Sequence, residues 1–317
     1  MREARKDIFT VGFYNVENLF DTVNDPTKAD TEYLPTSRKK WTVNRYLGKI
    51  KKLSSVISQL GTNYSSNMPV LVGLVEVENG KVVQDLINHA NLKKGSYGYV
   101  HYESPDERGI DVALIYNTNF FEVYSSKTYP LELRDDKGAV DYTRDILRVS
   151  GSLNGDLIHV LINHWPSRRG GGEETEELRI KAAKVVQKAV KEITDDISDA
   201  RIIIMGDFND DPISKSIKNY LVTDDFFNPM GSLFEKGIGT SSFNNRWNLF
   251  DQIIFSKNFL NSDTDKHVFE YAEVFNKHWL RVVKGKLKGS PFRTYIGPWY
   301  TGGYSDHFPV YAYLSKK

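Results

Sequence analysis

The stretch RIIIMGDFNDDP, residues 201–212, joins a continuous apolar run to three aspartates and an asparagine. An apolar run without polar interruptions is typical of a strand that is buried on both faces. A surface turn would account for the Asp, Asn and Pro residues that follow it. A divalent cation would also account for them, because packed carboxylates repel one another unless another charge compensates them. The other motifs of the sequence are needed to choose between these two explanations.

One calcium-binding motif can be excluded at this stretch. Asp207, Asn209 and Asp211 have the one, three, five spacing of an EF-hand loop, which also requires Gly at position six and Glu at position twelve. Those two positions hold Pro212 and Lys218. The stretch is therefore not an EF-hand.

The composition is that of a globular chain that can bury a large core. The 317 residues are 40% hydrophobic, 13% aromatic and 26% charged, and the formal net charge is +1. A chain this close to neutral contacts a polyanion through local patches and not through its overall charge. The chain has no cysteine, which excludes disulfides, thiolate zinc sites and cysteine nucleophiles.

We expect residues 1–317 to form a single domain, because no linker rich in Pro, Gly or Ser divides the chain. No apolar stretch is long enough to span a membrane. The N-terminal MREARKDIF shows no secretory leader, but a leader that had been removed would leave no trace, so localisation stays open. A monomer is the expected oligomeric state.

Two similar halves are expected, each with a strand, a loop, a helix and a second strand. Ligand sites gather at the strand ends of α/β units, and four of the expected ends carry Asn15, Glu76, His164 and Asp207. The Asn154-Gly155 pair predicts a hairpin at the start of the second half. The expected strands cover residues 9–15, 69–79, 111–117, 145–151, 156–163 and 201–207, and the expected helices cover about 44–60 and about 178–193.

Two more strand boundaries, together with the end at His164, carry polar side chains of the same kind. SDHFPV places Asp306 and His307 before an apolar strand, FDQIIF starts a strand with Asp251, and INHWPSR ends one in His164. Oxygen ligands without cysteine favour a hard cation such as Mg²⁺ or Mn²⁺. Histidines beside such a cation stabilise charge or move protons near neutral pH. These are the groups needed to cleave a phosphoester with water.

Six motifs, in the order NVENLF, GLVEVEN, NHWPSRRGG, GDFND, FDQIIFS and SDHFPV, resemble the endonuclease/exonuclease/phosphatase superfamily. The resemblance runs from about residue 9 to residue 314, which is nearly the whole chain. It implies the DNase I-like fold, an α/β four-layer α/β/β/α sandwich of two packed mixed sheets with helices outside. It also implies an active site at one edge of the paired sheets and a Mg²⁺ or Mn²⁺ cofactor.

The resemblance also implies roles for individual residues. Asp207 and Asn209 would orient the attacking water and hold the phosphate, and Asp251 would pair with His307. The implied catalytic residues are His164, Asp207, Asn209, Asp251 and His307. The implied metal ligands are Glu76, Asp306 and Asn15. The candidate substrate contacts are Arg144, Arg108, Asp111 and Arg168.

The chain departs from the family pattern at the metal glutamate. Val75 stands where relatives often have Gln. Glu78 is a rival ligand because alternation along a strand would place it on the same face as Glu76. Arg168 with Arg169 either clamps phosphate or lies in a solvated loop, and Trp165 either stacks on a base or packs. The remaining histidines are interpreted as structural, packing or surface residues: His159, His89, His101, His267 and His278.

We therefore predict metal-dependent hydrolysis of a phosphodiester by an activated water. Nucleic acid is the first choice of substrate and partner, which makes the protein a nuclease. The alternative is a phosphatase or phosphodiesterase acting on phosphoinositides, sphingolipids or small-molecule phosphoesters. A non-catalytic binding protein on the same fold ranks third, because none of the implied catalytic positions is replaced.

Overall fold

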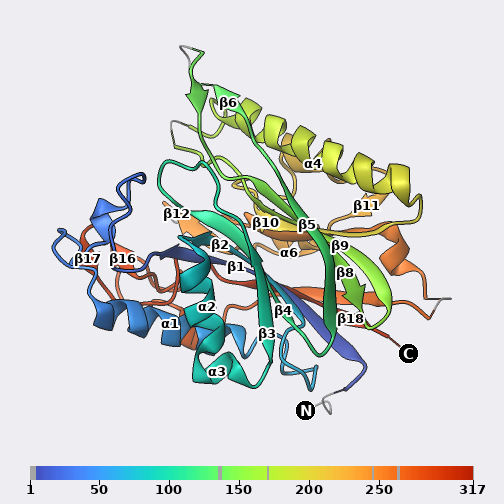
Figure 1. Ribbon diagram of the computed structural model, residues 1–317, viewed down its shortest axis with the longest axis horizontal. Helices are drawn as coiled ribbons and strands as arrows, with labels where there is room; N and C mark the ends of the chain where they lie inside the picture. The colour runs from blue at the N-terminus through green and yellow to red at the C-terminus, as the bar shows by residue number, and fades with distance from the viewer. Residues whose placement is uncertain (1–4, 135–137, 170, 245, 263–264, 317) are drawn as a thin grey trace.

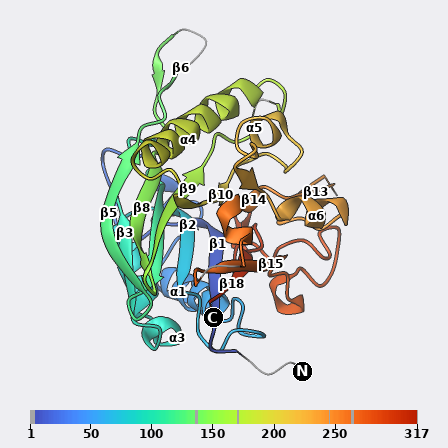
Figure 2. The ribbon, with the colours of Figure 1, turned by 90° about the vertical axis from the view of Figure 1, so that its right-hand side faces the viewer.

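Two six-stranded sheets are stacked face to face, and helices cover their outer faces (Figures 1 and 2). This architecture comes from a computed structural model, which describes residues 5–134, 138–169, 171–244, 246–262 and 265–316. The helix α4 lies on one side of the stacked sheets, and α1 lies on the other side (Figure 2). The four-layer α/β/β/α sandwich that we predicted is confirmed.

The first sheet has the strand order β15–β18–β1–β2–β4–β3. Its strands are β1 Ile8–Leu19, β2 Leu71–Val77, β3 Tyr97–His101, β4 Asp111–Asn117, β15 Val268–Val274 and β18 Val310–Ser315. The second sheet has the order β11–β14–β10–β9–β8–β5. Its strands are β5 Phe121–Tyr129, β8 Ile146–Leu153, β9 Asp156–His164, β10 Arg201–Asp207, β11 Phe226–Phe227 and β14 Asp251–Ser256.

Three two-stranded hairpins and the helices complete the chain. The hairpins pair β6 Leu133–Arg134 with β7 Val140–Asp141, β12 Ser241–Phe243 with β13 Arg246–Asn248, and β16 Tyr295–Ile296 with β17 Trp299–Tyr300. The α-helices are α1 Val43–Ile57, α2 Gly80–Asn88, α3 Ala90–Lys93, α4 Glu176–Asp196, α5 Lys215–Lys218 and α6 Met230–Glu235. The 3-10 helices are η1 Thr31–Tyr33, η2 Lys257–Leu260 and η3 His278–Leu280.

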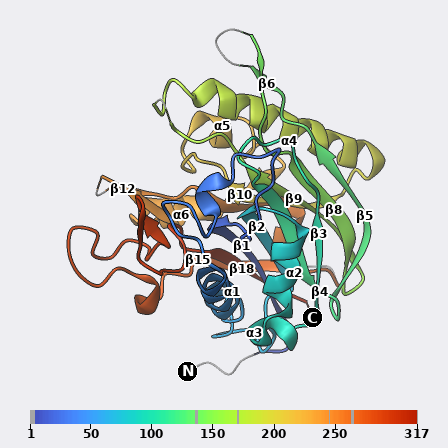
Figure 3. The ribbon, with the colours of Figure 1, turned by 60° about the vertical axis from the view of Figure 1, so that its left-hand side comes forward.

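Each expected half is present as a pair of parallel strands joined through a helix. β1 runs parallel to β2 through α1, and β9 runs parallel to β10 through α4. The helices α1, α2 and α3 lie together against the first sheet (Figure 3). The predicted helices were correct to within a few residues, but α2, α3, β3 and β5 were not predicted. β1 also continues past Asn15 to Leu19, beyond its predicted end.

The apolar run in β10 is explained by burial on both faces. Ile202 and Ile204 pack against α4, whereas Ile203 and Met205 pack between the two sheets. The sheets approach closely opposite Met205, where a Cβ on Gly73 would lie 2.7 Å from the Met205 sulfur. A side chain at residue 73 would therefore push the sheets apart. In the described part of the chain, no helix is long and apolar enough to cross a membrane.

His159 is a buried structural histidine, as predicted. Its Nδ1 lies 2.7 Å from Ser150 Oγ on β8, and its Nε2 has no partner among the described residues. Burial, together with the charge of Arg148, lowers the pKa of His159 to about 4. The folded protein therefore holds this ring neutral, whereas the unfolded chain takes up a proton below about pH 6.5.

This difference predicts a specific loss of stability in acid. Protonation favours the unfolded chain, so the free energy of unfolding should fall as pH drops from about 6.5 towards 4, by roughly 3 kcal/mol at most from this residue. His159→Gln should remove that part of the acid sensitivity. The measurement is urea unfolding of both proteins between pH 7.5 and 4. An unchanged difference between the two proteins across this range would contradict the prediction.

Candidate active site

The registers of the parallel strands bring the predicted residues to one edge of the sandwich. In the second sheet, Asp207 lies directly opposite His164 on one side and Asp251 on the other. In the first sheet, Asn15 lies opposite Val75, one residue before Glu76. The carboxyl ends of β1, β2, β9 and β10 therefore meet where the two sheets face each other.

The carboxylate of Asp207 is the centre of this cluster. Its Oδ2 accepts a hydrogen bond from Asn15 Nδ2 at 2.9 Å, which links the two sheets. Its Oδ1 accepts one from the Asn209 backbone N–H at 3.0 Å. The Nε2 atoms of His164 and His307 lie 3.8 and 3.9 Å from Oδ2. Asp207 is 2% exposed, so these groups replace most of its water.

His307 is held by Asp251 in the arrangement that the sequence suggested. The Nδ1 atom of His307 lies 2.6 Å from Asp251 Oδ2, and Asp251 is fully buried. The His307 backbone N–H donates to Ser305 Oγ, and Ser305 Oγ–H donates to the Asn15 carbonyl. These bonds fix the imidazole so that its Nε2 points towards Asp207.

The two histidines have opposite electrostatic environments. Burial opposes the protonation of His307, but Asp251 and Asp207 outweigh burial and raise its pKa well above the ordinary value. Burial, with the charges of Arg144 and Arg108, lowers the pKa of His164 well below it. Near neutral pH, one imidazole is therefore a cation and the other is neutral.

Asp207 is itself perturbed. Burial raises its pKa, and the neighbouring Asp251 adds to that shift, whereas the charge of His307 opposes it. A carboxylate whose pKa is raised towards neutrality is a better proton acceptor than a free one. The pair of Asp207 and His307 can thus exchange protons with a bound water and a phosphate oxygen.

The backbone is left-handed at the strand ends that carry the site. The φ angles are 51° at Glu17, 51° at Asn18, 65° at Glu76 and 50° at Asn209. Non-glycine residues adopt this conformation at a cost and concentrate at functional sites. The register shift between Val75 and Val77 also breaks the alternation of β2.

This bulge corrects the prediction that Glu76 and Glu78 share a strand face. Glu76 Oε1 lies 3.8 Å from His164 Nε2, inside the cluster. Glu78 instead accepts a hydrogen bond from the Asp21 backbone N–H, and burial raises its pKa to about 8. Among the described contacts of the two glutamates, only Glu76 reaches the cluster.

The oxygen donors at this edge fit a hard divalent cation. Glu76 uses Oε2 to accept from the Asn18 backbone N–H, which leaves Oε1 towards His164. Asp306 is 30% exposed at its side chain and uses Oδ2 to pair with Arg293 at 3.1 Å. Burial lowers the pKa of Lys49, and the charges of Glu17, Asp306 and Glu76 oppose that shift, so these carboxylates act on the same buried ammonium group. Carboxylate oxygens that face a polar edge are the donors that Mg²⁺ prefers.

Asn15, also expected as a metal ligand, is placed beside Asp207. Its amide N–H donates to Asp207, and its amide oxygen accepts from the Glu17 backbone N–H at 3.0 Å. Asp207, Asp251 and His307 lie close enough to hold a metal. However, the 2.6 Å separation of His307 Nδ1 from Asp251 is that of a hydrogen bond. We therefore interpret these three residues as an acid–base group.

Among the candidate substrate contacts, two arginines border the cluster. Arg144 is nearly buried; it donates to the Trp165 carbonyl at 2.9 Å and pairs with Asp106 at 3.2 Å. Arg108 is partly exposed and donates to Asn18 Oδ1 at 2.5 Å. Both guanidinium groups lower the pKa of His164, which places their positive charges beside it.

The other two candidate substrate contacts, Arg168 and Asp111, are bonded to other groups of the protein. Arg168 braces the turn after β10, where it donates to the Asn209 carbonyl at 2.8 Å and to Asp210 at 2.9 Å. Asp111 is buried and accepts from Ser104. The structure does not bring Asp111 into the cluster.

The indole of Trp165 and the side-chain amide of Asn209 also have defined partners within the protein. Trp165 is fully buried and packs edge-on against Phe208, with ring centroids 4.8 Å apart. It therefore does not stack on a base. The side chain of Asn209 donates to the Trp165 carbonyl at 3.0 Å, and so it supports the turn that carries Asp207.

Sequence reasoning missed the buried ion pair of Lys49 and Glu17. Lys49 Nζ lies 3.7 Å from Glu17, and both side chains are buried. Glu17 also accepts from the Thr294 backbone N–H at 2.6 Å, which ties the β16–β17 segment to the end of β1. One signal was available, since Lys49 interrupts the apolar face of the helix between Tyr46 and Leu53.

The sequence model of the Endonuclease/Exonuclease/phosphatase family matches residues 10–316. No curated protein matches this chain.

Solved structures with similar folds cover almost the whole chain. They include a humanized D. rerio TDP2 (TM-score 0.63, 15% identity, covering 98% of this chain and 100% of that one). D. rerio TDP2 complexed with a single-strand DNA product has a TM-score of 0.60 at 16% identity and covers 98% and 99% of the two chains. An endonuclease/exonuclease/phosphatase family protein from Bacteroides thetaiotaomicron has a TM-score of 0.57 at 17% identity and covers 98% and 95%. At these identities the likeness shows the fold, which is that of DNase I-like proteins.

The contact between Asp251 and His307 predicts non-additive effects on rate. Removing either residue disables the same oriented imidazole, so Asp251→Asn combined with His307→Ala should be scarcely slower than His307→Ala alone. Asp251→Asn combined with His164→Ala should come closer to multiplying the two losses. The measurement is kcat/KM for the single and double variants on one phosphodiester. Multiplied losses for Asp251 with His307 would show that they do not act as a unit.

Proposed function

The chain belongs to the endonuclease/exonuclease/phosphatase family, and we propose that it is a divalent-metal-dependent phosphodiesterase that cleaves nucleic acid. One observation carries the proposal. A buried carboxylate, Asp207, lies between a cationic imidazole held by Asp251 and a neutral imidazole, at an edge where Glu76 and Asp306 offer oxygen ligands.

In the proposed reaction, Asp207 accepts a proton from a water molecule as the water oxygen attacks phosphorus. The bond from phosphorus to the leaving alcohol oxygen breaks on the opposite side. His307 presents its Nε2 proton to the charge that develops on the phosphoryl oxygens, and Asp251 holds the ring in this orientation. A divalent cation held by Glu76 and Asp306 would polarise a phosphate oxygen as a Lewis acid.

Nucleic acid is favoured as substrate by the surroundings of the cluster. Arg108 and Arg144 place positive charge beside His164, and such local charge suits a chain of phosphates. Trp247, 39% exposed, stacks on Phe308, the residue after His307. Exposed aromatic rings near a cleavage site provide stacking surfaces for bases. The D. rerio TDP2 complex with single-strand DNA product is a further point in favour.

The first test is a panel of substrates with and without metal. In millimolar Mg²⁺, single-stranded DNA should be cleaved, and excess EDTA should abolish turnover until Mg²⁺ is restored. The panel also contains double-stranded DNA, RNA, inositol phosphates and sphingomyelin. Full turnover in EDTA would refute the metal requirement. Activity on a lipid or inositol phosphate alone would refute the choice of nucleic acid.

The second test concerns the turn after β10. Asp207→Asn should lower kcat by about 10²–10⁴-fold if Asp207 is the base. The fold should survive, because removing a buried charge relieves its desolvation cost and brings no loss of packing volume. The measurements are turnover on the best substrate of the panel and the melting temperature. A folded and fully active variant would show that Asp207 is not the base.

A further inference from the structure

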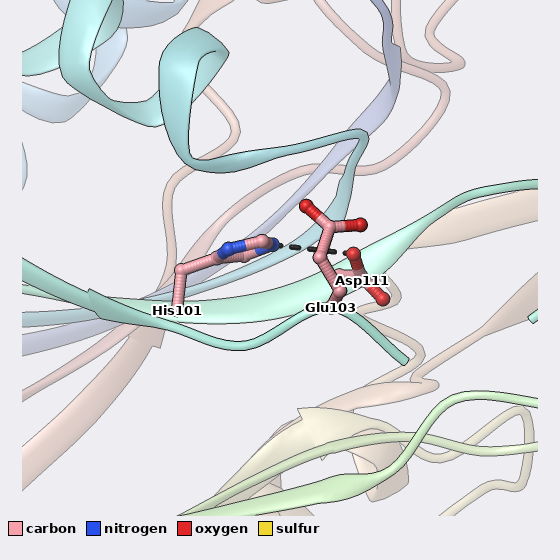
Figure 4. Close-up of side chains that lie close together, drawn as sticks. All are labelled: His101, Glu103 and Asp111. Atoms are coloured by element: carbon pink, nitrogen blue, oxygen red, sulfur yellow. Dashed lines mark hydrogen bonds and ion pairs between the residues drawn. The ribbon is translucent and has the colours of Figure 1, made fainter. Parts of the chain in front are cut away.

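A second group of metal-ligating side chains lies outside the active site, at the ends of β3 and β4 (Figure 4). His101 is the last residue of β3, Asp111 is the first residue of β4, and Glu103 lies in the segment between the strands. Each offers one ligand atom, and these atoms all lie within 4.8 Å of one another.

Two of the three side chains are fixed in place. His101 Nε2 lies 3.2 Å from Asp111 Oδ2, and the two side chains are 5% and 1% exposed. The other oxygen of Asp111 accepts from the Ser104 backbone N–H at 2.9 Å and from the Ser104 hydroxyl. A Cβ on Gly80 would lie 3.8 Å from His101 Nδ1, so the ring packs against the start of α2. Such supporting contacts orient ligands in metal sites.

Glu103 supplies the second carboxylate of this group. Its side chain points towards the His101–Asp111 pair in Figure 4. Partial burial and the adjacent Asp111 carboxylate raise the pKa of Glu103, although His101 and Lys28 offset part of this effect. The Lys28 ammonium group donates to the carbonyls of Ser104 and Asp106 at 2.9 and 3.3 Å. Two carboxylates therefore lie together with an imidazole, and in the described part of the chain neither forms an ion pair with a lysine or arginine.

We propose that His101, Glu103 and Asp111 form a second metal site, which takes a divalent transition-metal ion of the Zn²⁺ type. One imidazole and two carboxylates are a donor set for such an ion, whereas the oxygen donors around Glu76 suit Mg²⁺. His101 Nε2 and Asp111 Oδ2 form a hydrogen bond at 3.2 Å. Two ligands about 2.0–2.1 Å from a tetrahedral zinc ion are roughly 3.3 Å apart, so an ion that displaces the shared proton requires little movement of either side chain. Glu103, whose carboxylate oxygen lies within 4.8 Å of both other ligand atoms, is the third ligand.

The ion would fix the segment that carries two charged residues of the active-site border. Asp106 pairs with Arg144 at 3.2 Å, and Arg108 donates to Asn18. Asn18 in turn donates its backbone N–H to Glu76. Binding at His101 therefore holds the segment 102–110 in the conformation that places Arg108 beside the catalytic cluster. The ion is structural and does not touch the substrate.

The test measures metal binding and needs no turnover, so its outcome is independent of the proposed reaction. Wild-type protein is dialysed against Zn²⁺ in millimolar Mg²⁺, which occupies the oxygen-donor site, and bound zinc is counted by metal analysis. One zinc per chain is expected, also in Glu76→Gln. Affinity should fall at least tenfold in His101→Ala and Glu103→Gln, and stay unchanged in the control variants Glu107→Gln and His278→Ala.

Co²⁺ replaces Zn²⁺ in a parallel experiment that reports the ligands. The visible absorption of bound Co²⁺ should be present in wild type and Glu76→Gln and absent in Glu103→Gln, whose substitution on an exposed side chain leaves the fold intact. Melting temperatures identify any variant that fails to fold. Three results would each overturn the proposal: no zinc bound in Mg²⁺, equal binding by Glu103→Gln and wild type, or loss of the zinc in Glu76→Gln.

Discussion

The candidate active site at the edge of the two sheets depends on the buried carboxylate of Asp207, because both sheets must supply hydrogen-bond partners for this group. Removing a carboxylate from water costs several kcal/mol unless hydrogen bonds and opposite charge compensate it. The first sheet contributes the amide of Asn15, and the second contributes the Asn209 backbone N–H. His307 brings the positive charge. The register of each sheet and the distance between the sheets are constrained together at this point.

The left-handed strand ends are part of the same constraint. Each such residue costs on the order of 1–2 kcal/mol in backbone conformation. The backbone N–H of Asn18 reaches Glu76, and that of Asn209 reaches Asp207. The N–H of Glu17 reaches the side chain of Asn15. The left-handed backbone thus directs these N–H groups towards the site residues. The same backbone conformation therefore causes both the strain and the orientation of the site residues.

Most of the layers and the strand ends could be predicted from the sequence. A strand that is buried on both faces is a continuous apolar run, and a helix repeats its apolar residues with the helical period. Parallel pairing then brings strand ends such as His164 and Asp207 to one edge. The bulge at Glu76 could not be predicted, since a register shift of one residue leaves no mark in an alternating pattern. Buried pairs such as Lys49 with Glu17 depend on contacts between segments that are far apart in the chain. The contact of His101 with Asp111 could not be predicted either, because it depends on how β3 pairs with β4.

The ion pairs formed by the carboxylates around the candidate active site indicate where a bound cation would stabilise the site most. The carboxylates with a cationic partner are Glu17 with Lys49, Asp106 with Arg144, Asp251 with His307, and Asp306 with Arg293. Asp207 shares the charge of His307 with Asp251. Among the described contacts, Glu76 accepts a hydrogen bond from the Asn18 backbone N–H and lies 3.8 Å from the neutral His164, but it forms no ion pair with Lys or Arg. Because an uncompensated carboxylate gains most from a nearby positive charge, Glu76 would be the main ligand of the proposed divalent ion, and Asp306 would share its charge between that ion and Arg293.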